Sequence, residues 1–216
     1  MKFILFVEGY TEDKALPRFL KEWLDPKLTK PVGIKTIRFE GWQELVKDAP
    51  LKAKMHLEGP RKDDIIAIIS LLDLYGPTFY PTNLTCSKDR CIWAKKKIES
   101  SVNHPKYFQF FAVHEIEAWL LCEPDIFPLA VKNAFPERIR NPEEVNFDEP
   151  PAKLLQRLYP LHIGRSYKKA VNGIDLFKRL DPNIAYQKCP NLKDLLDKML
   201  ELAKCHSSEL QIRFSP

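Results

Sequence analysis

A nearly unbroken apolar run at residues 64–72 restricts the folds open to this chain more than any other feature. Apart from Asp64 and Ser70, every residue in the run is apolar, and most of these are β-branched. Such a run is typical of a strand that is covered on both faces, as in a parallel sheet flanked by helices. The run is far too short to cross a bilayer as a helix.

Three further apolar segments predict strands, and segments with helical periodicity separate them. Strands that alternate with helices predict a parallel sheet with right-handed crossover connections. The expected fold class is therefore α/β, a Rossmann-like parallel sheet flanked by helices. Thr11 is the expected N-cap of the first helix, with two acids in the turn that follows. The other strands are expected at Lys2–Val7, 32–39 and 107–113, and the helices at 11–24, 42–55 and 89–100.

The sequence changes in character after residue 123. Prolines interrupt short helical segments there, and a longer amphipathic helix is expected at 191–205. A chain of 216 residues is only slightly longer than one typical domain. We therefore expect an α/β core at 1–123, with residues 124–216 forming a helical C-terminal elaboration packed on that core.

The composition excludes several classes of protein. With 44% hydrophobic and 29% charged residues, the chain is neither disordered, collagen-like nor coiled coil. The net charge of +5 is too small to establish nucleic-acid binding by itself. The apolar start is followed by no small-residue cleavage site, so we expect a strand there, and an intracellular, cytoplasmic protein without a membrane partner.

Five scattered cysteines fit reduced thiols better than a disulfide framework. Cys86 and Cys91, with His104 after them, form the nearest approach to a zinc motif. A structural zinc site needs a second close pair of ligands, and the sequence has none. Reduced thiols are therefore the favoured interpretation.

Acidic residues follow three of the predicted strands. Glu8 follows the first, Asp73 the third, and Glu115 and Glu117 the fourth. In open parallel sheets, ligands bind beyond the carboxyl ends of the strands, and a set of oxygen ligands suits Mg²⁺ or Mn²⁺. A single acid at such a place often only caps the next helix, as Glu12 can do here, but three strand ends together favour a metal site. Spaced glycines for a dinucleotide and a Walker-type loop are both absent.

Residues 6–12, FVEGYTE, resemble the first motif of TOPRIM domains. These domains are the catalytic modules of topoisomerases, primases and the overcoming-lysogenization-defect (OLD) nucleases. The resemblance implies that one glutamate and an Asp-x-Asp pair from a later strand bind magnesium and act on phosphodiester bonds. Glu8 matches the glutamate and Asp73 the first aspartate, but Tyr75 stands in place of the second aspartate.

A closer resemblance extends over residues 3 to about 200. Five short segments, at 72–76, 114–120, 150–153, 167–173 and 188–190, resemble a bacterial TOPRIM-like family known as a domain of unknown function, DUF4276. Members of that family resemble the TOPRIM half of phage-defence systems, in which a nuclease-like protein works with an ATPase partner.

The resemblance assigns roles to the acids. Glu8 is expected to perform general acid or base catalysis beside the metal, and Asp73 to be a metal ligand. Glu115 and Glu117 are two residues apart, so on a helix they cannot both face the same way. We expect one of them to bind metal and the other to cap a helix, with Glu117 favoured as the ligand.

Cationic and aromatic residues supply the remaining candidates. Lys168 and Lys169, with Arg165, are expected to offset charge in a phosphoryl transition state, although a solvated helix face explains them equally well on local grounds. His114 is a candidate to orient a ligand or bind a phosphate, against the alternative of a simple hydrogen bond. Tyr75 is a candidate to stack on a base, against the alternative of packing.

The leading hypothesis is a Mg²⁺- or Mn²⁺-dependent phosphodiesterase, a nuclease that acts on nucleic acid, in a phage-defence or repair system with an ATPase partner. The alternative is a catalytically silent domain that binds nucleic acid or a partner protein. Tyr75 separates the two, because an active enzyme must recruit Glu115 or Glu117 to replace the lost aspartate. A small-molecule phosphatase would use the same metal chemistry.

Overall fold

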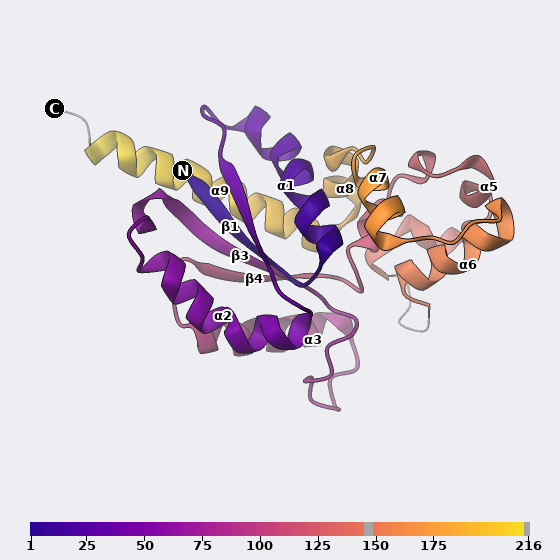
Figure 1. The fold of residues 1–216 in the computed structure, drawn as a ribbon, viewed down its shortest axis with the longest axis horizontal. Helices are drawn as coiled ribbons and strands as arrows, with labels where there is room; N and C mark the ends of the chain where they lie inside the picture. The colour runs from indigo at the N-terminus through magenta and orange to yellow at the C-terminus, as the bar shows by residue number, and fades with distance from the viewer. Residues whose placement is uncertain (145–148, 214–216) are drawn as a thin grey trace.

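A four-stranded parallel sheet forms the centre of the molecule (Figure 1). The computed structural model describes residues 1–144 and 149–213. Within them the strand order is β2-β1-β3-β4, and all neighbours are parallel. The α/β class predicted from the sequence is confirmed. The strands are β1 (Lys2–Val7), β2 (Gly33–Arg38), β3 (Ile65–Asp73) and β4 (Tyr107–Ala112).

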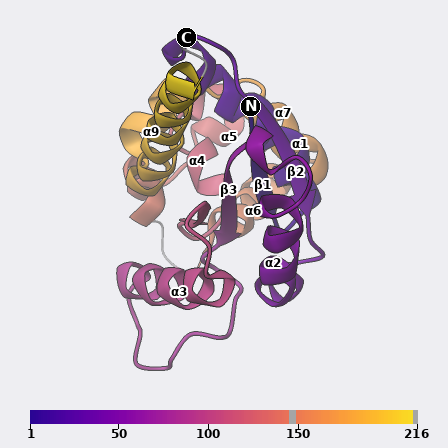
Figure 2. The same ribbon diagram turned by 90° about the vertical axis from the view of Figure 1, so that its left-hand side faces the viewer.

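Side chains of the central strands alternate between two apolar layers. In β1, Phe3, Leu5 and Val7 belong to one buried cluster, whereas Ile4 and Phe6 belong to the other. Both faces are therefore covered, which explains the unbroken apolar runs. Helices α1 (Tyr10–Leu24) and α9 (Pro190–Arg213) cover the first face, and α2 (Trp42–Leu57) and α3 (Ser87–Val102) the second (Figures 1 and 2).

The connection from β1 to α1 is shorter than expected. Gly9, not Thr11, is the N-cap, and Thr11 is a buried residue of the first turn. The side chain of Glu12 lies against Gly9, since a Cβ added to Gly9 would be 2.7 Å from Oε2 of Glu12. A glutamate at this helical position reaches back towards the start of its helix, as in a capping box.

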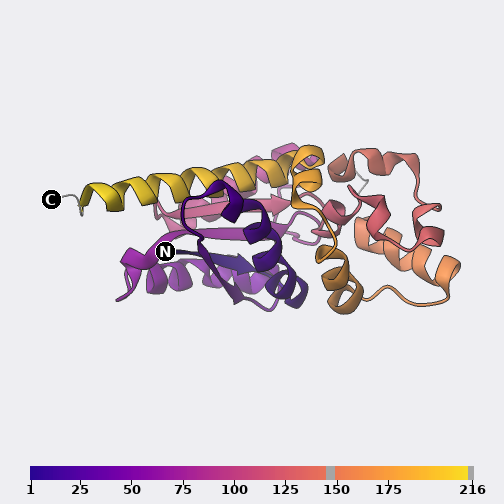
Figure 3. The ribbon, with the colours of Figure 1, turned by 90° about the horizontal axis from the view of Figure 1, so that it is seen from above.

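Short helices of the C-terminal part gather beyond the carboxyl ends of the strands (Figure 3). A π-helical turn, Lys169–Gly173, precedes α7. Among the described residues, no helix has both the length and the apolar character needed to cross a membrane. The helices are α4 (Glu117–Leu120), α5 (Leu129–Lys132), α6 (Pro151–Ile163), α7 (Ile174–Phe177) and α8 (Pro182–Lys188). Turns of 3₁₀ helix lie at Asp25–Lys27, Lys62–Asp64, Pro124–Ile126, Glu137–Arg140 and Pro142–Glu144.

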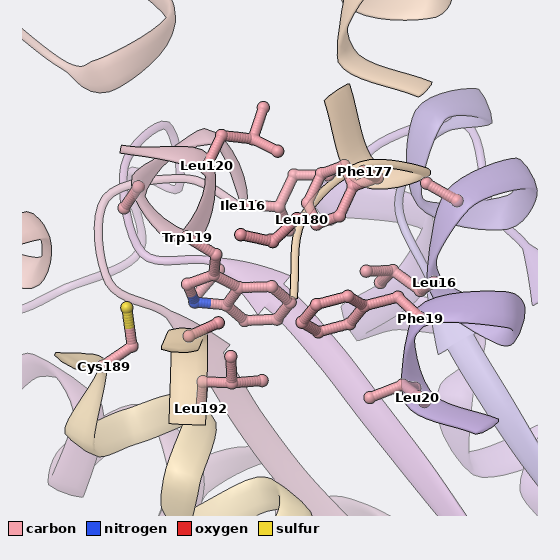
Figure 4. Packing of buried hydrophobic residues seen from close by; sticks show 14 of the residues in the cluster. Leu16, Phe19, Leu20, Ile116, Trp119, Leu120, Phe177, Leu180, Cys189 and Leu192 are labelled. Atoms are coloured by element: carbon pink, nitrogen blue, oxygen red, sulfur yellow. The ribbon is translucent and has the colours of Figure 1, made fainter. Parts of the chain in front are cut away.

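An aromatic contact joins the C-terminal helices to the sheet layer (Figure 4). The ring of Trp119 in α4 stacks on Phe19 of α1, with centroids 6.2 Å apart. Phe177 of α7 lies edge-on to both, at 5.6 Å from Phe19 and 6.4 Å from Trp119. Large aromatic side chains bury much apolar area, so this contact fixes α4 and α7 against α1. The segments around Glu117 and Lys169 are thereby held at the strand ends.

Candidate functional site

Five carboxyl groups from separate segments lie together at the carboxyl ends of the strands. Glu8 follows β1, Glu12 lies in the first turn of α1, and Asp73 ends β3. Glu115 and Glu117 follow β4, with Glu117 opening α4. The charges of Glu12 and Glu115 raise the pKa values of Glu8, Asp73 and Glu117, and the charge of Glu8 raises that of Asp73. We call these five residues the acid cluster.

Glu8 and Asp73 are joined directly. The backbone N–H of Asp73 donates a hydrogen bond to Oε1 of Glu8 at 2.5 Å. In turn, Oδ1 of Asp73 accepts from the backbone N–H of Ile116 at 3.1 Å. β1 and β3 are neighbours in the sheet, so their carboxyl ends meet, as the sequence predicted. The end of β3 therefore orients the Glu8 carboxylate, and the segment after β4 orients the Asp73 carboxylate.

Glu115 and Glu117 have different surroundings. Oε2 of Glu115 accepts from the backbone N–H of Ala152 at 2.9 Å, in the first turn of α6. Glu117 is completely buried. The ammonium of Lys169 lies 3.1 Å from Oε2 of Glu117 and 3.4 Å from Oε1 of Glu115. Oε1 of Glu117 is buried and has no hydrogen-bond partner among the described residues.

Burial and the charges of neighbouring acids raise the pKa values of Glu8, Glu12, Asp73 and Glu117. Burial raises the pKa of Glu8 to about 7; the hydrogen bond from Asp73 opposes the shift, and the charge of Glu12 adds to it. The pKa of Asp73 is raised well above its ordinary value, first by burial and then by the charges of Glu8 and Glu12. Carboxylates held this close repel one another and favour protonation or a cation between them.

Lys169 is the cation that the fold supplies. Burial raises the pKa of Glu117 to about 7, although the charge of Lys169 opposes this shift. Burial alone would lower the pKa of Lys169, but the charges of Glu117, Asp73 and Glu115 raise it, so its ammonium stays charged. Lys169 begins the π-helical turn, a rare conformation that is frequent at functional sites.

The donor chemistry of the acid cluster fits a hard divalent cation. All its donors are carboxylate oxygens, and Oε1 of Glu117 has no hydrogen-bond partner in the described part of the chain. The present positions of the side chains do not yet form such a site. Within residues 1–144 and 149–213, no group of three acid, histidine or cysteine side chains is placed to hold a metal ion. The place of a cation is taken by the Lys169 ammonium.

The other predicted residues lie outside the cluster. Arg165 and Lys168 are exposed, and no ion pair among the described residues joins either to the acids. His114 is buried with a left-handed backbone, φ 66°, and burial lowers its pKa to about 4, so it is neutral at pH 7. Its carbonyl accepts from the backbone N–H of Tyr75 at 2.8 Å. Tyr75 is half-buried and follows Asp73 by two residues.

The sequence interpretation missed two residues of this site. The sequence interpretation gave Glu12 only a capping role; its side chain does lie against the helix start, but it is also buried and its charge raises the pKa of Asp73. Its spacing of four from Glu8 was a usable signal, because the intervening turn brings both carboxylates to one strand end. Tyr167 is buried beside Glu117, and burial, with the charge of Glu117, raises its pKa.

Comparison with known proteins assigns the family. The family described as Domain of unknown function (DUF4276) matches residues 7–200. The chain belongs to this family. The DUF4276 resemblance that the five short segments predicted is thereby confirmed. A search of the curated proteins found no match.

Among solved structures, this DUF4276 protein is similar to the C-terminal region of the Burkholderia pseudomallei OLD protein. The identity is 17% and the TM-score 0.50, over 93% of this chain and 98% of that one. The C-terminal region of the Xanthomonas campestris pv. campestris OLD protein gives 16% identity and a TM-score of 0.47, over 98% and 97%. The first of these similarities supports a common fold for the DUF4276 chain and the OLD C-terminal region.

Proposed function

We propose that this protein is a Mg²⁺- or Mn²⁺-dependent phosphodiesterase, a TOPRIM-type nuclease that acts on nucleic acid. The observation that carries the proposal is the hydrogen-bonded pair of Glu8 and Asp73 at the ends of neighbouring strands. The pair lies in a cluster where burial raises the pKa of Glu8 to about 7. A general acid or base works best when its pKa is near the working pH.

The carboxylates divide into proton transfer and cation binding. Asp73 and Glu117 would hold the cation, with Glu8 and Glu115 at its side. A bound Mg²⁺ or Mn²⁺ polarises the phosphate and lowers the pKa of water. With a pKa of about 7, the Glu8 carboxyl exists in both protonation states at neutral pH. It can therefore accept a proton from the attacking water or donate one to the leaving oxygen.

The lysines have separate roles in the proposal. Lys169, already among the acids, would move towards the phosphate oxygens when a divalent cation enters, and would offset their charge. Lys168 and Arg165 are exposed, so they would bind the nucleic-acid backbone at a distance from the reacting phosphate. The OLD resemblance favours an ATPase partner for the same domain.

A second candidate function is supported by one observation, the ion pair between Lys169 and Glu117. A lysine that permanently neutralises the buried acid would remove the need for a divalent cation. The domain would then bind nucleic acid or a partner protein without cleaving anything. The replacement of the second TOPRIM aspartate by Tyr75 agrees with this alternative.

Cleavage assays with divalent cations separate these functions. Wild type, Glu8→Gln and Asp73→Asn proteins would be incubated with single- and double-stranded DNA and RNA in Mg²⁺, Mn²⁺ or EDTA. Glu22→Gln is the matched control, because Glu22 is paired with Arg18 at the surface of α1. Nuclease activity that needs metal, Glu8 and Asp73 supports the proposal, and activity that persists in both variants overturns it. If nothing is cleaved and calorimetry finds no Mn²⁺ binding that depends on Asp73, the silent domain is correct.

A further inference from the structure

A cavity of about 560 Å³ opens next to the acid cluster. The lining residues Leu74 to Pro77 come directly after Asp73 in sequence, in the loop between β3 and α3. The volume of the cavity lies within the usual range for small-molecule sites. The cavity is lined by Leu74, Tyr75, Gly76, Pro77, Thr85 and Arg90.

Tyr80 connects this cavity to the acids. Its hydroxyl donates to the carbonyl of Leu74 at 3.3 Å, and the guanidinium of Arg90 lies 5.2 Å from the centre of its ring. Burial is the main cause that raises the pKa of Tyr80, and the charges of Glu8 and Asp73 contribute. Two lining residues also place the cavity beside the cluster: Leu74 follows Asp73 directly, and the backbone N–H of Tyr75 donates to the carbonyl of His114, next to Glu115, at 2.8 Å.

The walls of the cavity present an aromatic ring and a cation. Nε of Arg90 donates to the carbonyl of Leu84 at 2.9 Å, which fixes the plane of the guanidinium. The ammonium of Lys153 lies 5.9 Å from the centre of the half-buried Tyr75 ring. Gly76 has φ 112°, and a Cβ there would meet nothing within 4 Å, so this wall stays open. A planar group with a negative charge nearby matches these walls.

We propose that the cavity binds one nucleotide of a single-stranded nucleic acid, next to the phosphodiester at the acid cluster. The base stacks on Tyr75, and Arg90 binds the adjacent phosphate, while Thr85 offers a hydroxyl at the rim. Aromatic rings with cations beside them are the common means of binding single strands. A paired base keeps its faces inside the duplex and cannot enter such a cavity. The position beside the reacting phosphate rests on the proposed function, whereas the binding itself does not.

Binding without cleavage tests the cavity alone. The probe is a short fluorescein-labelled oligothymidylate, compared with a duplex of equal length, in EDTA and on a Glu8→Gln background, by fluorescence anisotropy. Tyr75→Phe keeps the ring, and Tyr75→Leu removes it. Arg90→Gln removes the cation, and Arg140→Gln is the matched control, because Arg140 is exposed and paired with Glu137.

We expect the single strand to bind more tightly than the duplex. Tyr75→Leu should weaken its binding about tenfold, and Tyr75→Phe less than about twofold. Arg90→Gln should weaken binding and reduce its salt dependence by about one phosphate contact, whereas Arg140→Gln should do neither. Equal binding of the duplex, no binding of either probe, or equal binding by Tyr75→Leu and Tyr75→Phe would overturn the proposal.

Cleavage measured in parallel separates this proposal from the function. Binding that depends on Tyr75 and Arg90, without metal-dependent cleavage by the wild type, leaves the nucleotide cavity in place and refutes the nuclease. Metal-dependent cleavage that Tyr75→Leu and Arg90→Gln leave unchanged refutes the cavity and retains the nuclease.

Discussion

The backbone N–H of Asp73 donates a 2.5 Å hydrogen bond to the carboxylate of Glu8, and this bond joins the end of β3 to the end of β1. A glutamine at position 8 would keep a carbonyl acceptor for this bond while removing the charge. Burial raises the pKa of the glutamate from 4.5 to about 7, so the charged form is disfavoured in the folded protein. The charge therefore costs stability, while the hydrogen bond contributes to it.

Glu8→Gln should stabilise the metal-free protein at high pH and not at low pH. The pKa of Glu8 is about 7 when folded and near 4.5 when unfolded, so the folded state binds more protons between these values. The contribution of Glu8 to the free energy of unfolding thus falls as the pH rises from 4.5 to 7 and stays low above that. Glu8→Gln does not lose this stability, so at pH 8 it should be more stable than the wild type by about 1–3 kcal/mol. The partial exposure of Glu8 limits the difference.

Urea denaturation in EDTA at several pH values measures this difference. Glu22→Gln, at the surface of α1, should show none of the pH dependence. If Glu8→Gln is more stable by the same amount at pH 5 and pH 8, the pKa of Glu8 is not raised by burial, and its effect on stability comes from packing.

Lys169→Met should destabilise the protein, and Lys168→Met should not. Methionine keeps the length of Lys169 but leaves the buried Glu117 without its ion-pair partner. Removing one partner of a buried pair is costly, and because Lys169 is partly exposed we expect about 1–3 kcal/mol at pH 8. The loss should shrink at pH 5, where Glu117, with a pKa of about 7, is protonated. Lys168 is exposed, so its substitution should change stability by less than about 0.5 kcal/mol.

Divalent cations should reverse the effect of Lys169→Met. If the acid cluster is a cation site occupied by lysine, Mn²⁺ should raise the melting temperature of Lys169→Met more than that of the wild type, because no ammonium competes. An equal shift in both proteins would show that Lys169 and the cation do not share a place. Thermal denaturation with and without Mn²⁺ makes the measurement.

The sheet was predictable because three of its strands, β1, β3 and β4, are buried on both faces, whereas the edge strand β2 is partly exposed. A strand covered on both sides needs apolar residues in succession, and residues 64–72 and Lys2–Val7 show this pattern without tertiary information. The start of α1 was predicted one residue late, at residue 11 rather than Tyr10: Gly9, not Thr11, is the N-cap, and the Glu12 side chain lies against it. Such a contact depends on three-dimensional proximity and leaves no periodic signal.

The acids of the site were predictable, but their partners were not. Glu8 and Asp73 end strongly apolar strands, and a parallel sheet brings such ends together. Lys169 is more than fifty residues from Glu117 in sequence, and lysine pairs on a helix face are commonplace. The packing of α7 against α1 helps to hold Lys169 at the acids, while its neighbour Lys168 stays exposed.

Gly9→Ala should disturb the site through Glu12. Gly9 has φ −143°, an extended conformation open to any residue, so the substitution causes no backbone strain. The added Cβ would lie 2.7 Å from Oε2 of Glu12, which must move. Because Oε2 ends a flexible side chain, it can shift at little cost, and we expect a loss below about 1 kcal/mol in the free energy of unfolding. Glu12→Ala removes the clash, so the double variant should be more stable than the two single effects predict when added. Additive effects in a denaturation cycle would contradict the contact.

Substitutions at Glu115 and Glu117 decide which acid binds the cation. Helix α6 begins after Pro150, which has no side-chain cap, and Oε2 of Glu115 accepts the Ala152 N–H in its place. Glu115→Gln keeps an acceptor there and Glu115→Ala does not, so we expect Glu115→Ala to be less stable than Glu115→Gln by about 1 kcal/mol.

The same hydrogen bond occupies a carboxylate oxygen of Glu115. In Glu117, Oε1 has no hydrogen-bond partner among the described residues, so Glu117 is the better ligand. Glu117→Gln should therefore weaken Mn²⁺ binding in calorimetry about tenfold or more, and Glu115→Gln much less, since its capping oxygen is retained. If the two variants weaken Mn²⁺ binding equally, both acids are ligands and the cap of α6 is released on metal binding. If Glu115→Gln has the larger effect, the division of roles between the two acids is reversed.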